Sequence, residues 1–209
     1  MTGQSEDAST VDDYEDSRIR SSRWPLVIGT VSVLYASLGF LLNLMALLAI
    51  VVGPVLQANY TGVKPVSLPP LLLIGQLILV IALLSIGVLL LVSGIATLKR
   101  RNWGPRGINL WVILRLALLL VAVLFQVFTV KASVDWQLAS QEAVRDGLRD
   151  DGHSDEQIKK WSPELEATEL RTRTIVWALS FTAMLAVCPI VLGLVLSSKR
   201  IREEWTGWP

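Results

Sequence analysis

Polar side chains inside long apolar stretches are the first residues of this sequence that could do chemistry. Asn43, Gln76 and Gln126 carry amides, and Arg115 is the one charged residue in any of these stretches. In lipid, amides on neighbouring helices form hydrogen bonds with each other, and polar groups at a shared depth can also bind a polar substrate or an ion. We favour interhelical hydrogen bonds for the three amides, because no intramembrane carboxylate or second charge accompanies them.

Arg115 lies seven residues beyond Ile108, which places it about 10 Å along a helix that begins there. Helical side chains lean toward the N-terminus of their helix, and long cationic side chains extend to the headgroups. We therefore expect Arg115 to reach back to the cytoplasmic headgroups. A buried functional charge is the alternative.

Acidic residues around the single histidine are the candidates for metal binding: Asp150, Asp151, His153, Asp155 and Glu156. Their spacing matches neither an EF-hand loop nor a zinc pattern, and no cysteine or second histidine is near. The pattern is equally typical of a helix end followed by a capped helix start, so we expect no metal site. The sequence also lacks a nucleophile elbow, a Walker loop, a dinucleotide turn and an HExxH motif, so we expect neither an enzyme nor a cofactor.

The apolar stretches that must position these groups are long enough to cross a membrane. Hydrophobic residues make up 52% of the 209 residues and charged residues 18%. The stretches span residues 26–52, 71–98, 108–130 and 174–197, and about 20 helical residues suffice to cross the hydrocarbon. We expect an all-α integral membrane four-helix bundle in a lipid bilayer. A net charge of +1 gives no case for binding nucleic acid.

Clusters of basic residues set the expected orientation, because such clusters stay on the cytoplasmic side. Residues 97–107 carry four positive charges between the second and third stretches, and further clusters precede the first stretch and follow the fourth. We expect a multi-pass protein of the cell (inner) membrane with both termini cytoplasmic. Four tryptophans on that side are typical of an interfacial aromatic belt: Trp24, Trp103, Trp205 and Trp208.

The chain divides into five expected segments. Residues 1–23 are a disordered acidic cytoplasmic tail, and residues 24–130 hold transmembrane helices 1–3 with a short outer loop and a basic inner turn. Residues 131–173 form an outer helical hairpin, residues 174–198 transmembrane helix 4, and residues 199–209 a cytoplasmic tail. In the first helix, small residues recur at steps of three and four, interrupted only by Ile50, and predict a close packing seam: Gly29, Ser32, Ala36, Gly39, Asn43, Ala46 and Gly53.

Turn and capping signals predict where the helices begin and end. Gly53-Pro54 is expected to end the first helix, and Gly104-Pro105 to break the chain so that the third helix begins near Ile108. The third helix continues past the apolar stretch to about Arg149. A capping box of Ser154 and Gln157 opens a short helix toward Trp161. A second start at Ser162-Pro163 begins a helix that runs into the fourth stretch.

Residues 89–118, LLLVSGIATLKRRNWGPRGINLWVILRLAL, resemble uncharacterised bacterial membrane proteins with four helices and a basic, Trp-containing inner turn. The resemblance implies four spans and no particular activity. The lengths of the outer loops are also similar to those of tetraspanins, but the large loop has no cysteine and no CCG motif, so we do not assign that family.

We expect a non-catalytic structural, accessory or partner-binding component of the membrane. The outer hairpin or the acidic tail would make contact with a protein partner. The alternative is a small transporter or channel subunit that acts as a homo-oligomer. These two differ in whether water reaches Asn43, Gln76 and Gln126.

Overall fold

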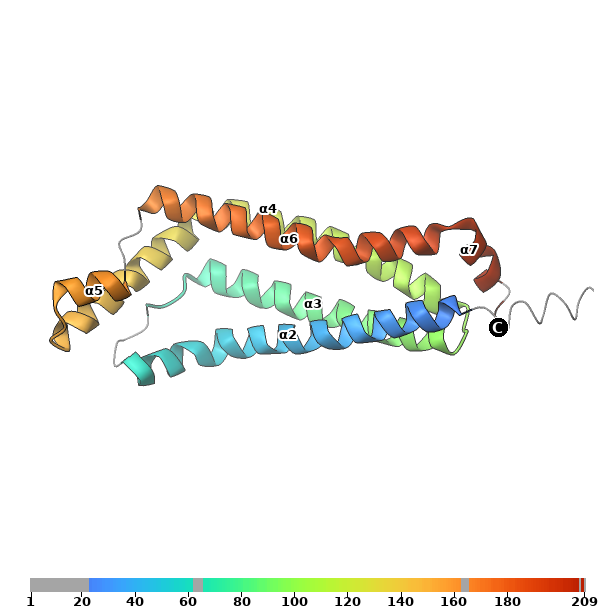
Figure 1. The fold of residues 1–209 in the computed structure, drawn as a ribbon, viewed down its shortest axis with the longest axis horizontal. Coiled ribbons are helices and arrows are strands. Elements are labelled where there is room, and N and C mark those ends of the chain that lie inside the picture. The colour runs from blue at the N-terminus through green and yellow to red at the C-terminus, as the bar shows by residue number, and fades with distance from the viewer. Residues whose placement is uncertain (1–22, 62–65, 163–165, 207, 209) are drawn as a thin grey trace, which may run out of the picture.

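The computed structural model describes residues 23–61, 66–162, 166–206 and 208, and within them every regular element is a helix. The helices are α2 (Trp24–Thr61), α3 (Pro70–Leu98), α4 (Trp103–Asp150), α5 (Asp155–Trp161), α6 (Ala167–Ser197) and α7 (Lys199–Thr206) (Figure 1). The expected all-α class is confirmed. The acidic tail, residues 1–22, and the expected helix start at Pro163 lie outside the described residues.

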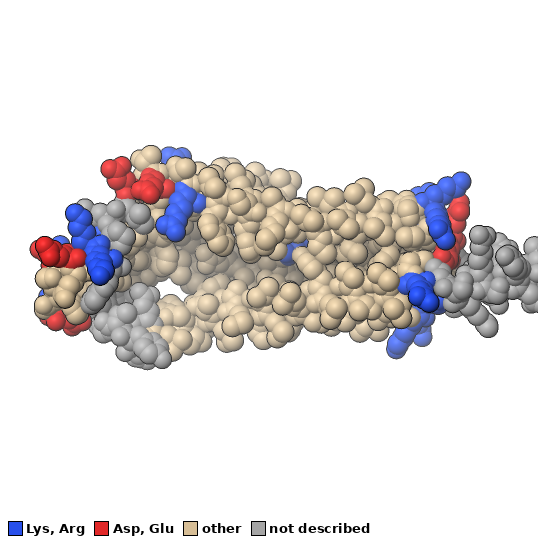
Figure 2. All heavy atoms as spheres, in the orientation of Figure 1, with Lys and Arg blue, Asp and Glu red and all other residues tan. Residues whose placement is uncertain are grey.

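Four of the described helices, α2, α3, α4 and α6, are long and apolar enough to cross a membrane. Figure 2 shows nearly all the charged side chains gathered at the two ends of the molecule, with a broad surface between them that is uncharged except for one small basic patch near its centre. One end holds the start of α2, the α3–α4 turn and α7, and we call it the terminal end (Figure 1). The other holds α5 and the end of α4, and we call it the hairpin end.

The packing of the helices differs between the two ends. α3 packs against α2 and α4, and α4 packs in turn against α6. The main core takes residues from all four long helices: Ile28, Ala36, Leu90, Ile108, Trp111, Val112, Leu192 and Leu196. The second core, Val130, Val134 and Leu170, comes from α4 and α6 alone. The four helices therefore share a core toward the terminal end, and only two of them share the core nearer the hairpin end.

The seam of small residues on α2 is confirmed over its first two turns. A Cβ added to Gly29 would lie 3.0 Å from the carbonyl oxygen of Gly94 on α3, and one added to Gly94 would lie 3.1 Å from the Cβ of Ser32. Small residues thus allow the two backbones to approach closely. At Gly39 and Gly53, farther along α2, an added Cβ would meet nothing within 4 Å among the described residues. That half of the seam has no neighbour there.

Two expected helix boundaries in the apolar region are wrong. α2 continues through Pro54 to Thr61, because one proline removes a single hydrogen bond, whereas ending a helix in an apolar segment would leave several backbone groups without partners. α4 begins at Trp103 and includes Gly104 and Pro105, since a proline costs little in a first turn. Gly104 is needed there, because a Cβ would lie 2.6 Å from the backbone nitrogen of Thr97.

The extension of α4 beyond its apolar stretch is confirmed, and it ends at Asp150. Gly152 turns the chain with a φ of +82°, and the capping box of Ser154 and Gln157 opens α5. The side chain of Arg145 then donates two hydrogen bonds, of 3.0 and 2.8 Å, to the carbonyl oxygen of Ser162. These bonds hold the end of α5 against α4.

The expected helix start at Ser162-Pro163 is corrected at Ser162, which is the C-cap of α5 and not an N-cap. Within the described residues α6 begins at Ala167, with Glu166 as its N-cap residue. The returning arm of the hairpin holds the short helix α5, and the short helix expected between Ser154 and Trp161 is confirmed. A capping box followed so soon by a second start signal favours two helices over one, because each start needs its own cap.

The end of the chain folds back as α7, and two of the tryptophans expected in an interfacial belt are buried there. Trp208 stacks on Trp24 with ring centroids 5.1 Å apart, and the guanidinium of Arg106 lies 5.5 Å from the ring of Trp205. Only 7% of Trp205 and 5% of Trp208 is exposed. The belt expectation is wrong for these two residues, because intramolecular ring contacts bury them, whereas Trp103 remains 42% exposed.

Candidate ligand site between α4 and α6

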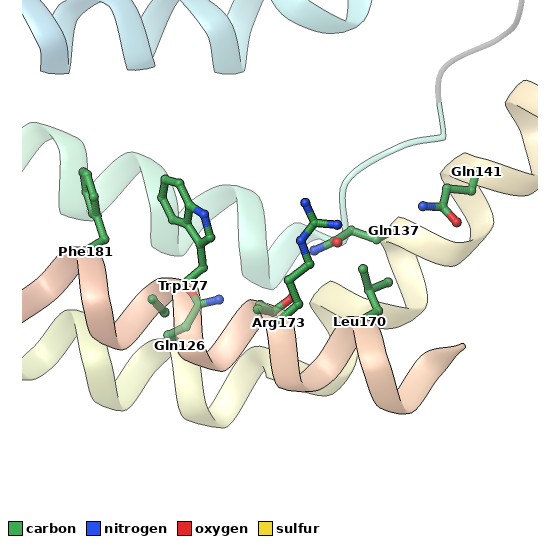
Figure 3. Close-up of a pocket in the computed structure, with 9 residues that line it drawn as sticks. Gln126, Gln137, Gln141, Leu170, Arg173, Trp177 and Phe181 are labelled. Atoms are coloured by element: carbon green, nitrogen blue, oxygen red, sulfur yellow. The ribbon is translucent and has the colours of Figure 1, made fainter. Parts of the chain in front are cut away.

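A cavity of about 500 Å³ opens between α4 and α6 toward the hairpin end. Its lining residues are Gln126, Gln137 and Gln141 from α4, and Leu170, Arg173, Thr174, Trp177, Ala178 and Phe181 from α6 (Figure 3). This size is in the range of small-molecule sites, which combine apolar walls with a few well-placed polar groups.

Helical spacing brings the lining residues to one face of each helix. The α6 residues recur at steps of three and four from Leu170 to Phe181, which is the period of a single helical face. On α4, Gln126 and Gln137 are eleven residues apart, or about three turns. The two faces oppose each other because α4 and α6 share the small core of Val130, Val134 and Leu170.

The chemistry of the cavity changes along its length. Gln141, Gln137 and Arg173 lie toward the hairpin end, whereas Trp177 and Phe181 lie on the opposite side of the site (Figure 3). The two aromatic rings stack with their centroids 5.5 Å apart and their planes at 24°. One end of the cavity therefore offers hydrogen bonds and a positive charge, and the other offers aromatic surface.

Arg173 is the only charged residue among those that line this cavity. Within the described part of the chain its guanidinium has no carboxylate within salt-bridge distance. The amide of Gln137 donates a hydrogen bond of 3.3 Å to Ser133, so that side chain is held by its own helix. A guanidinium without an internal counter-charge can bind a carboxylate or phosphate with paired hydrogen bonds.

No family model matches the chain, and comparison with curated proteins and solved structures found no match. The cavity and the charges must therefore carry the inference of function. Of the residues that line the cavity, only Gln126 was a candidate site residue in the sequence analysis. The regular spacing from Leu170 to Phe181 was a usable signal for a shared face, but nothing in it indicated which helix would lie opposite.

The three amides of apolar stretches have different surroundings. Asn43 on α2 donates a hydrogen bond of 2.6 Å to the carbonyl oxygen of Gly39 on its own helix. Gln126 lines the cavity, whose walls come from α4 and α6 and include neither Asn43 nor Gln76. Gln76 on α3 follows Gly75, whose backbone meets the ring of Phe125. Gln126 thus opens into a site formed with α6, while Asn43 bonds along α2.

Arg115 is buried, with 8% of its surface exposed, so the expectation that it reaches the headgroups is wrong. Tyr35 on α2 and Cys188 on α6 both pack against the main core, and their polar groups lie near enough to the guanidinium of Arg115 to be affected by its charge. Trp111 packs edge-on against Tyr35 with ring centroids 5.8 Å apart. The side chain is held inside because α2 and α6 both cover this face of α4. Its Nε atom makes no hydrogen bond within the described part of the chain.

The acidic residues around His153 form the turn between α4 and α5. The carboxylate of Asp155 lies 3.4 Å from the Nε atom of Arg149. A second guanidinium nitrogen of Arg149 lies 3.2 Å from the carboxylate of Asp146. Among the described residues, no group of three or more His, Cys, Asp or Glu side chains comes together as metal ligands would. Ser154 accepts the backbone N–H of Gln157 at 3.4 Å, as a helix cap does.

Proposed function

We propose that this chain is an integral protein of the cell (inner) membrane, with four spanning helices, that binds a ligand at its outer face. The support is the distribution of its surface: uncharged side chains cover nearly all of the middle and charges lie at both ends (Figure 2). Many large apolar side chains along the four long helices are exposed, among them Leu34, Met45 and Leu194 at 65–68%. Such a surface is costly in water and suited to lipid.

The proposed orientation places both termini in the cytoplasm. Trp24 at the start of α2 stacks on Trp208 near the end of the chain, so both ends of the described chain lie together, as four crossings require. The described basic residues at this terminal end are Arg23, Lys99, Arg100, Arg101, Arg106, Lys199, Arg200 and Arg202. This excess of positive charge favours the cytoplasmic side. The hairpin end would then face outward.

The cavity between α4 and α6 is the observation on which the binding role rests. Its polar lining consists of three amides, the hydroxyl of Thr174 and a guanidinium, groups that form hydrogen bonds but do not take up or release protons near neutral pH. General acid–base catalysis needs a group that titrates near the working pH. We therefore propose a non-catalytic accessory or partner-binding component, in which the hairpin beside the cavity contacts a protein partner.

Cysteine labelling in intact cells tests this proposal. In a Cys188→Ala background, which removes the one native cysteine, a membrane-impermeant maleimide should label Gln141→Cys at the polar end of the cavity. Asp151→Cys at the hairpin end is the accessible control. Lys99→Cys at the terminal end should be labelled only after permeabilisation. Labelling of Lys99→Cys in intact cells would overturn the orientation, and protection of Gln141→Cys would overturn the open outer site.

A small transporter or channel subunit is the second candidate, and buried Arg115 favours it. Intramembrane charges that face a protein interior commonly mark the path of a substrate or ion. A carrier or channel for anions should give measurable chloride or phosphate uptake into proteoliposomes, and Arg115→Gln should abolish that uptake. Equal uptake with wild-type protein and with protein-free liposomes would remove this candidate.

A further inference from the structure

The cavity between α4 and α6 lies at the depth where a lipid headgroup would meet it. Arg173 is the last charged residue before the apolar stretch 174–197, which contains no Asp, Glu, Lys or Arg. In a spanning α6 this position is the boundary between headgroups and hydrocarbon. Trp177 and Phe181, one and two turns farther along α6, would then lie beside the upper part of the acyl chains.

The two ends of the cavity match the two parts of an amphiphile. The guanidinium of Arg173 and the amides of Gln137 and Gln141 are at one end, and the stacked rings of Trp177 and Phe181 are at the other (Figure 3). Guanidinium groups bind phosphate with paired hydrogen bonds, and glutamine amides can both donate to and accept from hydroxyl groups. Among the described residues that line this cavity none is a carboxylate, so these residues offer no partner for the ammonium group of a zwitterionic lipid.

We propose that the cavity binds an anionic phospholipid of the outer leaflet, of the class whose headgroup carries hydroxyls. Arg173 binds the phosphate, Gln137 and Gln141 bind the headgroup hydroxyls, and an acyl chain lies along Trp177 and Phe181. The inference rests on the proposed membrane-spanning function. Two neighbouring charges on α6, Glu169 and Arg171, are exposed as Arg173 is, but they do not line the cavity.

Competition between two lipids tests the proposal. The purified full-length protein in neutral detergent is mixed with equal amounts of phosphatidylglycerol and phosphatidylcholine of the same acyl chains, and retained lipid is counted by native mass spectrometry. We expect the anionic lipid to be retained preferentially. Arg173→Gln should reduce that preference about tenfold, the change that one charge-assisted contact to phosphate corresponds to.

Arg171→Gln is the matched control, because it makes the same change of charge on the same helix at a residue outside the cavity. It should keep the preference of the wild-type protein. Equal retention of the two lipids by the wild-type protein, or an equal loss of preference in both variants, would overturn the proposal. Both variants are first compared with the wild type for thermal unfolding, so that a folding defect is recognised.

Competition with glycerol phosphate distinguishes a site for a lipid from a site for a soluble anion with the same headgroup chemistry. If the acyl chain contributes, a hundredfold excess of glycerol phosphate should leave the bound lipid in place, and Trp177→Ala should weaken its retention. Displacement at equimolar glycerol phosphate would show a free-anion site and overturn the lipid assignment. Failure of the membrane arrangement would appear separately, as labelling of Lys99→Cys in intact cells.

Discussion

Gly94 is a residue whose missing side chain determines how closely two helices approach. An added Cβ there would lie 3.1 Å from Ser32 and 3.2 Å from the carbonyl oxygen of Gly29. Gly94→Leu should therefore force α2 away from α3 and lower the stability by about 1–3 kcal/mol, the usual cost of overpacking. Thermal unfolding in detergent micelles measures this change.

Gly87 on the same helix supplies the control for that substitution. An added Cβ at Gly87 meets nothing within 4 Å among the described residues, so Gly87→Leu should leave the unfolding temperature within a degree or two of wild type, as an unconstrained surface change does. If both leucines lowered the unfolding temperature equally, the close contact at Gly94 would not be what holds α2 to α3.

The contact of Tyr35 with Arg115 predicts a measurable coupling between these two residues. Tyr35→Phe keeps the ring that packs on Trp111 and removes the hydroxyl that interacts with Arg115. Because the net contribution of a typical intramolecular polar contact is about 0.5–1.5 kcal/mol, the free energy of unfolding should fall by about that amount.

A double-mutant cycle isolates this contribution. In an Arg115→Leu background the charge is absent, so Tyr35→Phe should cost much less than it does in the wild-type protein. An equal cost in both backgrounds would show that the tyrosine hydroxyl acts on something other than the guanidinium.

At the scale of elements, α7 is held by two ring contacts. Arg106 near the start of α4 lies over Trp205 of α7, and Trp208, just after α7, stacks on Trp24 at the start of α2. Trp208→Ala should release α7 and speed its cleavage by trypsin at Arg200 and Arg202, because an aromatic pair contributes about 0.5–1.5 kcal/mol beyond its buried area. Mass spectrometry of timed digests measures the cleavage.

Trp103→Ala is the comparison for this experiment, since Trp103 lies at the same end of the molecule and is 42% exposed. It should leave the rate of cleavage in α7 unchanged. Cleavage at the wild-type rate in Trp208→Ala would mean that the ring contact does not hold α7 in place.

At the scale of the whole molecule, the unequal cores predict unequal rigidity. Near the terminal end, residues of all four long helices share one core, whereas the core nearer the hairpin end joins only α4 and α6. Spin labels at the exposed residues Leu26 and Leu194, at the terminal end, should give a narrow distance distribution. Labels at the exposed residues Val55 and Val176, toward the hairpin end, should give a broader one, because fewer packed contacts restrain α2 there.

Pulsed electron paramagnetic resonance measures both pairs in the same Cys188→Ala background. Distributions of equal width would show that α2 is restrained along its whole length.

Much of the fold follows from signals that are local in the chain. The four long apolar helices, the extension of α4 to Asp150 and the capping box at Ser154 were all predictable, because each depends on residues within a few turns of one another. Prolines misled the prediction at Pro54 and Pro105. A proline removes one backbone hydrogen bond. Whether the helix continues past it depends on the surroundings, which the proline does not indicate.

The cavity and the surroundings of Arg115 depend on which helix faces meet. The sequence alone did not determine which faces those are. Gln126 could be chosen as a polar residue in an apolar stretch, but its neighbours Arg173 and Trp177 lie on another helix. Arg115 was expected at the headgroups, and Tyr35 from α2 and Cys188 from α6 surround it instead. Trp24 and Trp208 are at opposite ends of the described chain and stack on each other. Helix positions and the charges at their ends are encoded locally, whereas burial and contacts between distant residues arise only when the helices pack.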